Sequence, residues 1–187
     1  TISNTCLGVK LYKNNSRLVV TGMSSNSVEV WDLGSNPRTN SWTRLSSLSI
    51  DSPRRLNIQY DPMSSATLVD LTLRNGYARL NIAEPSGTLS LLDSVNYGSN
   101  SYNDSVLINN YLVLADDNSS SAFVKIANIS NLNTFNSDYF SLSSQVTTSG
   151  WGWTASVSPS GPKVGYLGGQ GGAFIAPNST TGIPEIV

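Results

Sequence analysis

The sequence predicts an all-β fold, an antiparallel β-barrel or β-sandwich of about ten short strands. Two observations lead to this prediction. Short apolar or alternating segments are separated by turns rich in Gly, Pro, Asn and Ser, and no stretch keeps a 3.6-residue period with helix caps. The 187 residues contain no internal boundary, so we expect one domain, residues 1–187. Because the first residue is Thr1, we expect that domain to be excised from a longer protein.

The first hairpin is expected near the N-terminus. Residues 17–22 form a short apolar run, and residues 27–33 alternate along their length. The polar segment between them, residues 23–26, suits a turn. We therefore predict two adjacent antiparallel strands here.

The clearest hairpin is centred on Asn75-Gly76. Asn-Gly suits a type I′ turn, because both central residues of that turn need positive φ. The turn would fix the register of residues 68–74 against residues 77–82. The apolar pairs predicted on one face are Leu73 with Ala78, Leu71 with Leu80, and Val69 with Ile82. The pairs predicted on the other, solvated face are Arg74 with Tyr77, Thr72 with Arg79, and Asp70 with Asn81.

Seven further segments have the length and composition of strands. They are Thr88–Leu92, Ser105–Ile108, Tyr111–Leu114, Ala122–Ala127, Trp151–Val157, Lys163–Leu167 and Ala173–Ala176. The segments between them contain turn formers, such as Asn109-Asn110 and the glycine-rich residues 168–172.

One internal similarity links residues 18–36 to residues 112–131. Each copy has a strand, a polar turn, a second strand and a small polar exit. Trp31-Asp32 in the first copy resembles the dipeptide of WD-repeat propeller blades. A blade repeats about every 40 to 45 residues, so the two copies would need an unrecognised blade between them. We therefore interpret them as two ordinary hairpins.

Composition excludes several classes of chemistry. The chain has no histidine and one cysteine, while 52 residues are Ser or Asn. Triads of the Ser-His-Asp or Cys-His kind lack their general base. Cys6 can form no intramolecular disulfide and is expected to be a small buried apolar residue. We expect no cofactor and no metal.

Charge is sparse and unevenly distributed. The net charge is −1, so nucleic acid is not an expected partner. Nine of the eleven Lys and Arg residues lie within residues 1–80. We expect this excess to be balanced in space by acids from elsewhere in the fold, with a basic patch around Arg38, Arg44, Arg54 and Arg55 as the alternative. No run of about 18 apolar residues occurs, so we expect no membrane insertion.

Aromatic and polar residues supply the candidate binding site. Alternation in a strand would place the indoles of Trp151 and Trp153 on one face, where they could stack on sugar rings or anchor an interface, although burial in the core is equally compatible. Tyr97 and Tyr102 lie in an Asn/Ser-rich segment with Asn103 and are expected to be exposed loop residues. Asp116 and Asp117 precede a polar loop tip and complete the predicted binding set.

The size and the Ser/Asn/Thr-rich, charge-poor composition of the whole chain resemble a viral capsid spike or projection domain. The resemblance is strongest to the astrovirus capsid spike, a compact antiparallel barrel that dimerises on the virion. It implies a domain cut from a capsid or attachment protein and located on the virion surface. It also implies a non-enzymatic role in attachment to a host receptor or glycan, exposure to neutralising antibodies, and a homodimer.

Two other classes remain open. A secreted carbohydrate-active enzyme fragment on a propeller-like scaffold needs only two carboxylates and no histidine. Its candidate acids would be Glu29, Asp32, Glu84, Asp116 and Asp117. A structural shell or filament subunit would self-assemble without binding a ligand.

Overall fold

The computed structural model consists of β-strands joined by turns. It describes residues 6–13, 16–22, 26–38, 41–61, 66–96, 102–108, 111–116, 123–128, 139–141, 154–157, 165–168, 172–182 and 184–186. Within these residues sixteen strands form four four-stranded sheets. Neighbouring strands pair antiparallel, which confirms the all-β antiparallel prediction. Each sheet is open with two separate edge strands, so none of these four sheets closes into a barrel.

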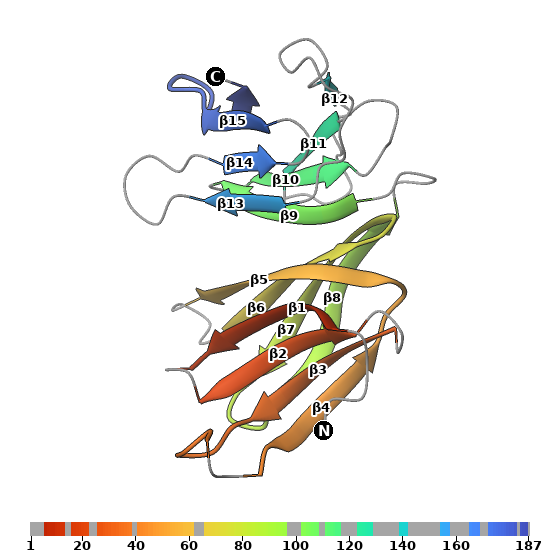
Figure 1. The fold of residues 1–187 in the computed structure, drawn as a ribbon, viewed down its shortest axis with the longest axis vertical. Helices are drawn as coiled ribbons and strands as arrows, with labels where there is room; N and C mark the ends of the chain where they lie inside the picture. The colour runs from red at the N-terminus through yellow and green to blue at the C-terminus, as the bar shows by residue number, and fades with distance from the viewer. Residues whose placement is uncertain are drawn as a thin grey trace. The chain divides into compact units, whose positions relative to one another are not determined.

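The strands fall into two compact units, residues 1–94 and 95–187. The first sheet of unit 1 contains β1 (Cys6–Tyr12), β2 (Arg17–Gly22), β3 (Ser27–Asp32) and β4 (Thr43–Ser49), and the second contains β5 (Pro53–Asp61), β6 (Ala66–Leu73), β7 (Gly76–Ala83) and β8 (Thr88–Asn96). In both sheets the strands lie side by side in chain order (Figure 1).

Unit 2 repeats this organisation. Its first sheet contains β9 (Tyr102–Ile108), β10 (Tyr111–Asp116), β11 (Phe123–Asn128) and β12 (Tyr139–Ser141), and its second contains β13 (Thr154–Val157), β14 (Gly165–Gly168), β15 (Gly172–Pro177) and β16 (Pro184–Ile186). In each unit the first strands of the two sheets lie against each other, β1 against β5 and β9 against β13. The same four-stranded arrangement therefore occurs four times along the described chain.

This repetition explains the internal similarity in the sequence. Its first copy is the β2–β3 hairpin and its second is the β10–β11 hairpin. Both hairpins are the central pair of their sheets, and the complete sheet β5–β8 lies between them in the chain. Both copies are hairpins, as interpreted from the sequence, and they occupy equivalent positions in two of the four sheets. The intervening repeat was hidden because its central hairpin, β6–β7, shares little of the sequence pattern.

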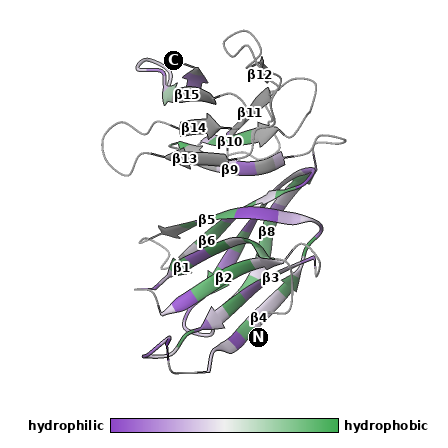
Figure 2. Ribbon diagram, viewed as in Figure 1, coloured by the Kyte–Doolittle hydropathy of each residue, from purple (hydrophilic) through white to green (hydrophobic). Residues whose placement is uncertain are grey.

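The core of unit 1 forms where alternating apolar residues of its two sheets face each other. Figure 2 shows hydrophobic and hydrophilic residues alternating along these strands. The fully buried members include Val19, Val28 and Val30 from the first sheet and Leu71 and Leu80 from the second. The two sheets are also joined by Thr21 of β2, whose Oγ1 donates to the carbonyl oxygen of Arg54 of β5 at 2.6 Å.

The β6–β7 hairpin has the predicted faces but a different register. The turn residues are Arg74 and Asn75, and Leu73 pairs with Gly76. Neither Asn75 nor Gly76 has a positive φ, so the predicted type I′ turn is wrong. The register differs by two residues, which returns every side chain to the same face. The apolar face therefore points into the core as predicted.

Two contacts account for the observed register. The amide of Arg74 donates to the carbonyl of Ser52 at 3.0 Å, which ties the turn to the segment before β5. In the observed register Asp70 also lies opposite Arg79. In the predicted register Asp70 would have lain opposite Asn81. Because Asp70 is fully buried, a cationic partner directly across the strand lowers the cost of burying its charge.

The sequence predicted that the polar face of this hairpin would be solvated, but the face is buried. Asp70, Thr72 and Tyr77 have no exposed surface. Tyr77 donates its hydroxyl hydrogen to Asp70 Oδ1, and Arg79 Nε donates to the same oxygen at 2.8 Å. Burial, with the nearby charge of Asp70 and the hydrogen bond to it, raises the pKa of Tyr77. Asp70, Tyr77 and Arg79 are hydrogen-bonded to one another on this face, whereas Asp70 Oδ2, Arg79 Nη2 and Asn81 Oδ1 are buried without a hydrogen-bond partner among the described residues. A pattern of polar residues cannot distinguish such a face from one exposed to water.

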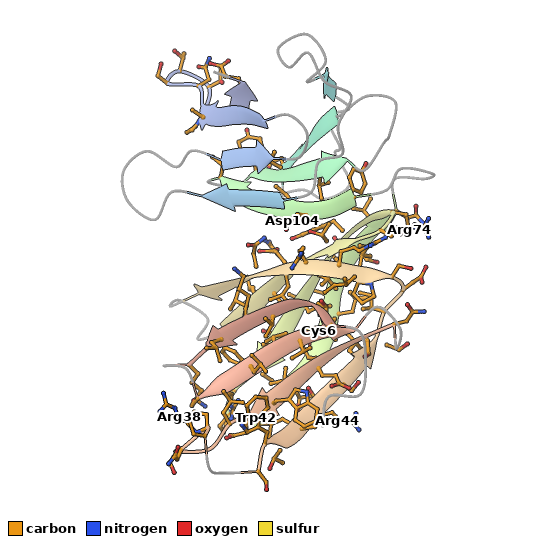
Figure 3. All side chains as sticks on the ribbon, viewed as in Figure 1. Cys6, Arg38, Trp42, Arg44, Arg74 and Asp104 are labelled. Carbon is orange, nitrogen blue, oxygen red and sulfur yellow. The ribbon has the colours of Figure 1, made fainter. Side chains whose placement is uncertain are left out.

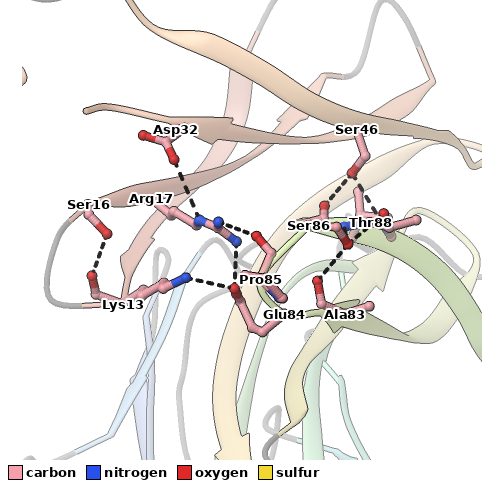
Figure 4. Close-up of polar contacts among 12 residues, drawn as sticks. Lys13, Ser16, Arg17, Asp32, Ser46, Ala83, Glu84, Pro85, Ser86 and Thr88 are labelled. Atoms are coloured by element: carbon pink, nitrogen blue, oxygen red, sulfur yellow. Dashed lines mark hydrogen bonds and ion pairs between the residues drawn. The ribbon is translucent and has the colours of Figure 1, made fainter.

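A polar network joins the β1–β2 turn to the β7–β8 turn (Figure 4). Arg17 is 6% exposed, and its guanidinium donates to Glu84 Oε2 at 2.6 Å and to the carbonyl of Pro85 at 2.5 Å. Lys13 pairs with the same Glu84 oxygen at 2.9 Å. Ser46 of β4 donates to the carbonyl of Gly87 at 2.7 Å. Two of the N-terminal cations, Lys13 and Arg17, are therefore paired with an acid about 70 residues further along the chain.

Cys6 differs from its expected environment. It is a free thiol at the start of β1 and is exposed, so the prediction of a buried residue was wrong. The edge position of β1 in its sheet leaves this end of the strand uncovered. No helix with the length and apolar character of a membrane span occurs among the described residues.

Candidate functional site

The predicted binding residues are only partly within the described structure. Tyr97, Asp117, Trp151 and Trp153 lie outside the described residues. The predicted strand Trp151–Val157 is described from Thr154, the first residue of β13. The proposed roles of these four residues in binding stay predictions.

The other predicted residues meet at one end of the β9–β10 pair. Tyr102 begins β9 and is the Cα partner of Asp116, the last residue of β10, while Asn103 follows Tyr102 in β9. Tyr102 has no exposed surface, so the expectation of an exposed loop position was wrong for this residue. An aromatic ring at the start of a strand becomes part of the packing of its sheet, even when the flanking sequence is rich in Asn and Ser.

All three glutamates of the chain are engaged by neighbouring side chains. Glu29 accepts from Arg44 and Trp31, and Glu84 accepts from Arg17 and Lys13. Glu185 accepts two hydrogen bonds from Asn178 Nδ2, at 3.0 and 3.1 Å. The acid candidate Asp32 accepts from the amide of Gly34 at 2.7 Å. Each of these carboxylates thus takes part in at least one contact within the fold.

No grouping of three or more His, Cys, Asp and Glu side chains that could hold a metal ion exists in the part of the chain that the structure describes.

The structure instead brings an aromatic side chain and two arginines together at one end of the first sheet. Trp42 directly precedes β4 and is 43% exposed, the highest value for any described aromatic side chain. Its indole Nε1 donates to the carbonyl of Pro37 at 3.1 Å, which holds Trp42 against the segment that carries Arg38. Arg44 follows two residues after Trp42. In Figure 3 the side chain of Trp42 is drawn between those of Arg38 and Arg44. We call Arg38, Trp42 and Arg44 the Trp42 surface.

The Trp42 surface is supported by ordered contacts within the sheet. Arg44 lies opposite Trp31 in the β3–β4 pair, and its Nη1 donates to Glu29 Oε1 at 3.0 Å. The other oxygen of Glu29 accepts from Trp31 Nε1 at 2.9 Å. The Glu29 side chain is only 9% exposed, whereas that of Arg44 is 55% exposed. A buried carboxylate therefore holds one nitrogen of Arg44, while more than half of the Arg44 side chain stays exposed.

This arrangement can bind a ligand without catalysing a reaction of that ligand. An exposed indole offers a flat apolar face for a sugar ring or an apolar side chain. The guanidinium groups offer hydrogen-bond donors in a planar fork. Pro37 fixes the indole nitrogen, so the ring has little freedom to lose when a ligand binds.

Sequence reasoning missed Trp42, although it contained a usable signal. Trp42 stands in the polar run Pro37–Thr43, among Arg, Thr, Asn and Ser. An aromatic residue in a polar segment is the same signal that selected Tyr97 and Tyr102. Of the four arginines considered as a basic patch, Arg38 and Arg44 lie at the Trp42 surface, whereas Arg54 and Arg55 lie in β5.

No family model matches this sequence. No curated protein matches it either.

Solved structures match the fold. A protein from Lactobacillus plantarum aligns with a TM-score of 0.69 and 16% identity, over 97% of this chain and 54% of its own. A Bacteroides uniformis protein assigned as a 6-phosphogluconolactonase aligns with a TM-score of 0.62 and 13% identity, over 97% of this chain and 53% of its own. The β-propeller domain of Myceliophteria thermophila Cps50 aligns with a TM-score of 0.59 and 11% identity, over 98% of this chain and 53% of its own.

At these identities the likeness concerns the fold alone. The chain spans about half the length of each of these proteins. The fold that it shares with them is built from consecutive four-stranded antiparallel sheets. Each blade of a β-propeller is one sheet of this kind.

Proposed function

We propose that this chain is a non-enzymatic recognition module that binds a glycan or a glycosylated receptor through the Trp42 surface. The observation that carries the proposal is the exposed indole of Trp42, fixed by Pro37 and flanked by two arginines. The scaffold that we propose is propeller-like, in place of the barrel or sandwich predicted from the sequence. The fourfold repetition of one sheet arrangement and the likeness to a propeller domain support that assignment.

Binding of the purified chain to a glycan array tests the proposal. We expect a defined set of glycans to bind, and Trp42→Ala to weaken that binding about five- to thirtyfold, because stacking of an aromatic ring contributes on the order of 1–2 kcal/mol. Leu92→Ala is the matched control, since Leu92 is 55% exposed and lies on β8, in the other sheet of unit 1. Absence of any bound glycan, or equal binding by wild type and Trp42→Ala, would overturn the proposal.

A carbohydrate-active enzyme is the second candidate. It is favoured by the enzyme assignment of the Bacteroides uniformis protein that shares the fold. It is opposed by the engagement of all three glutamates in ion pairs and hydrogen bonds. Turnover of a polysaccharide that disappears in Glu29→Gln or Asp117→Asn would support the enzyme, and no turnover under conditions that permit binding would support the recognition module.

The virion surface is the narrower setting that we propose, with a host receptor as partner and a homodimer as the assembled form. Size and the Ser/Asn-rich composition support it. Sequencing upstream of Thr1 tests the setting, for which we expect a basic, shell-forming segment. Light scattering during size-exclusion chromatography tests the assembly, and a monomeric mass would contradict the dimer.

A further inference from the structure

We propose that the ligand of the Trp42 surface is an acidic saccharide, one that carries a carboxylate or a sulfate group. This inference rests on the proposed function and adds the chemical class of the ligand. Three observations lead to it. One positive charge at this surface is not balanced by an acid among the described residues, several guanidinium N–H donors are available there, and the exposed indole belongs to the same surface.

The charge at the Trp42 surface does not cancel. Arg44 is matched by Glu29, which lies 3.0 Å from its Nη1. Arg38 is exposed and has no ion-pair partner among the residues that the structure describes. Since Arg38, Arg44 and Glu29 together leave one positive charge, an anionic group placed here would gain a partner, while a cationic group would be repelled. The whole chain has a net charge of −1, so this excess is a local property of the surface.

The available donors match an oxyanion. A guanidinium carries five N–H groups, and in the described structure Arg44 uses its Nη1 in the hydrogen bond to Glu29. Its remaining N–H groups and all of those of Arg38 can face a ligand. Carboxylate and sulfate oxygens accept two parallel hydrogen bonds from such a fork, and these charge-assisted bonds are about twice as strong as neutral ones.

The position of the indole favours a saccharide over a free anion. Trp42 is held to Pro37, the residue before Arg38, stands two residues before Arg44 and is 43% exposed, so a ring stacked on it could place an acidic substituent toward a guanidinium. A free inorganic anion would use the arginines and gain nothing from the indole. The surface therefore selects a ligand with both a flat ring and an acidic group.

Two matched pairs of probes test the inference by isothermal titration calorimetry. One pair is an oligogalacturonate and its methyl ester, and the other is a sulfated galactan oligosaccharide and its desulfated form. We expect wild type to bind the acidic member of at least one pair about tenfold more tightly than the neutral member, the ratio that one charge-assisted hydrogen bond supplies. Preference within the first pair identifies a carboxylate ligand, and preference within the second identifies a sulfate ligand.

Arg38→Gln isolates the contribution of the charge. We expect the ratio of acidic to neutral affinity to fall close to one in this variant, whatever its affinity for the neutral members. Arg74→Gln is the matched control, because Arg74 is an exposed arginine in the β6–β7 turn of the same unit. It should keep the full preference.

The outcomes separate this inference from the proposed function. Equal binding of acidic and neutral probes, with sensitivity to Trp42→Ala, would overturn the acidic ligand and leave the recognition module intact. A preference for the acidic probes that persists in Arg38→Gln would also overturn the inference of an acidic ligand. Failure of every saccharide to bind would overturn the proposed function itself.

Discussion

Asp70 lies directly across from Arg79 in the β6–β7 hairpin, and Arg79 Nε donates to Asp70 Oδ1 at 2.8 Å. Asp70 has no exposed surface, and the Arg79 side chain is 17% exposed. The pairing of Asp70 with Arg79 accounts for the register of this hairpin. A register shifted by two residues keeps the apolar face in the core but separates the buried carboxylate from its cation.

Removing one member of this pair should be costly. Arg79→Met retains much of the side-chain volume but leaves Asp70 buried without its cation, so we expect the free energy of unfolding to fall by about 3–5 kcal/mol. Urea denaturation followed by tryptophan fluorescence measures the loss. Arg74→Met is the control, and as an exposed substitution it should change stability by less than about 0.5 kcal/mol. Equal stabilities of the two variants would show that the pair does not determine the register.

Stability should decrease at alkaline pH because of Tyr12. Burial raises the pKa of Tyr12 to about 12, from an ordinary value of 10.0. Above pH 10 the unfolded chain releases the hydroxyl proton that the folded protein retains, so stability is fully present below pH 10 and falls as the pH rises toward 12. The contribution of Tyr12 to this loss should be about 1 kcal/mol at pH 11.

Urea denaturation at pH 9 and pH 11 measures that loss. Tyr12→Phe should show a smaller decrease between the two values than wild type. A residual decrease is expected in the variant, because burial raises the pKa of Tyr77 as well. A decrease of unchanged size in Tyr12→Phe would contradict the assignment.

Gly87 should tolerate alanine poorly, because two separate constraints act on it. Its φ is +74°, and a Cβ there would lie 2.5 Å from Leu45 Cδ1. Gly182 has a nearly equal φ of +71°, but a Cβ there would have nothing within 4 Å. Both alanine variants should lose about 1 kcal/mol from the positive φ, and Gly87→Ala should lose about 1–3 kcal/mol more from overpacking. Thermal unfolding of the two variants measures the difference, and equal melting temperatures would show that Leu45 moves aside at no cost.

The fold class was predictable because it depends on a pattern that every strand carries. Alternation and turn residues located the β2–β3 and β6–β7 hairpins, and the apolar face predicted for β6–β7 is the one in the core. The register of β6–β7 was not predictable from Asn75-Gly76, because a contact with Ser52 and the pairing of Asp70 with Arg79 outweigh the local preference of the turn. Long-range contacts of this kind have no signature within the hairpin itself.

The candidate site was less predictable than the fold. Tyr102 and Trp42 are both aromatic residues in polar segments, yet Tyr102 is fully buried and Trp42 is 43% exposed. What separates them is the hydrogen bond that holds Trp42 to Pro37 outside the sheet, and the location of Tyr102 within β9. Composition correctly directed attention to aromatic residues beside polar ones, but only the positions of the strands show which of them faces solvent.

The most direct test of the account is the response of the four tryptophan indole signals to ligand. In a ¹H–¹⁵N spectrum each indole N–H of the chain gives one peak, and Trp42→Phe identifies the peak of Trp42. Titration with an acidic oligosaccharide that binds the chain should shift the Trp42 peak most, with a smaller shift of Trp31, which shares Glu29 with Arg44. Shifts confined to the peaks of Trp151 and Trp153, with Trp42 unchanged, would contradict recognition at the Trp42 surface.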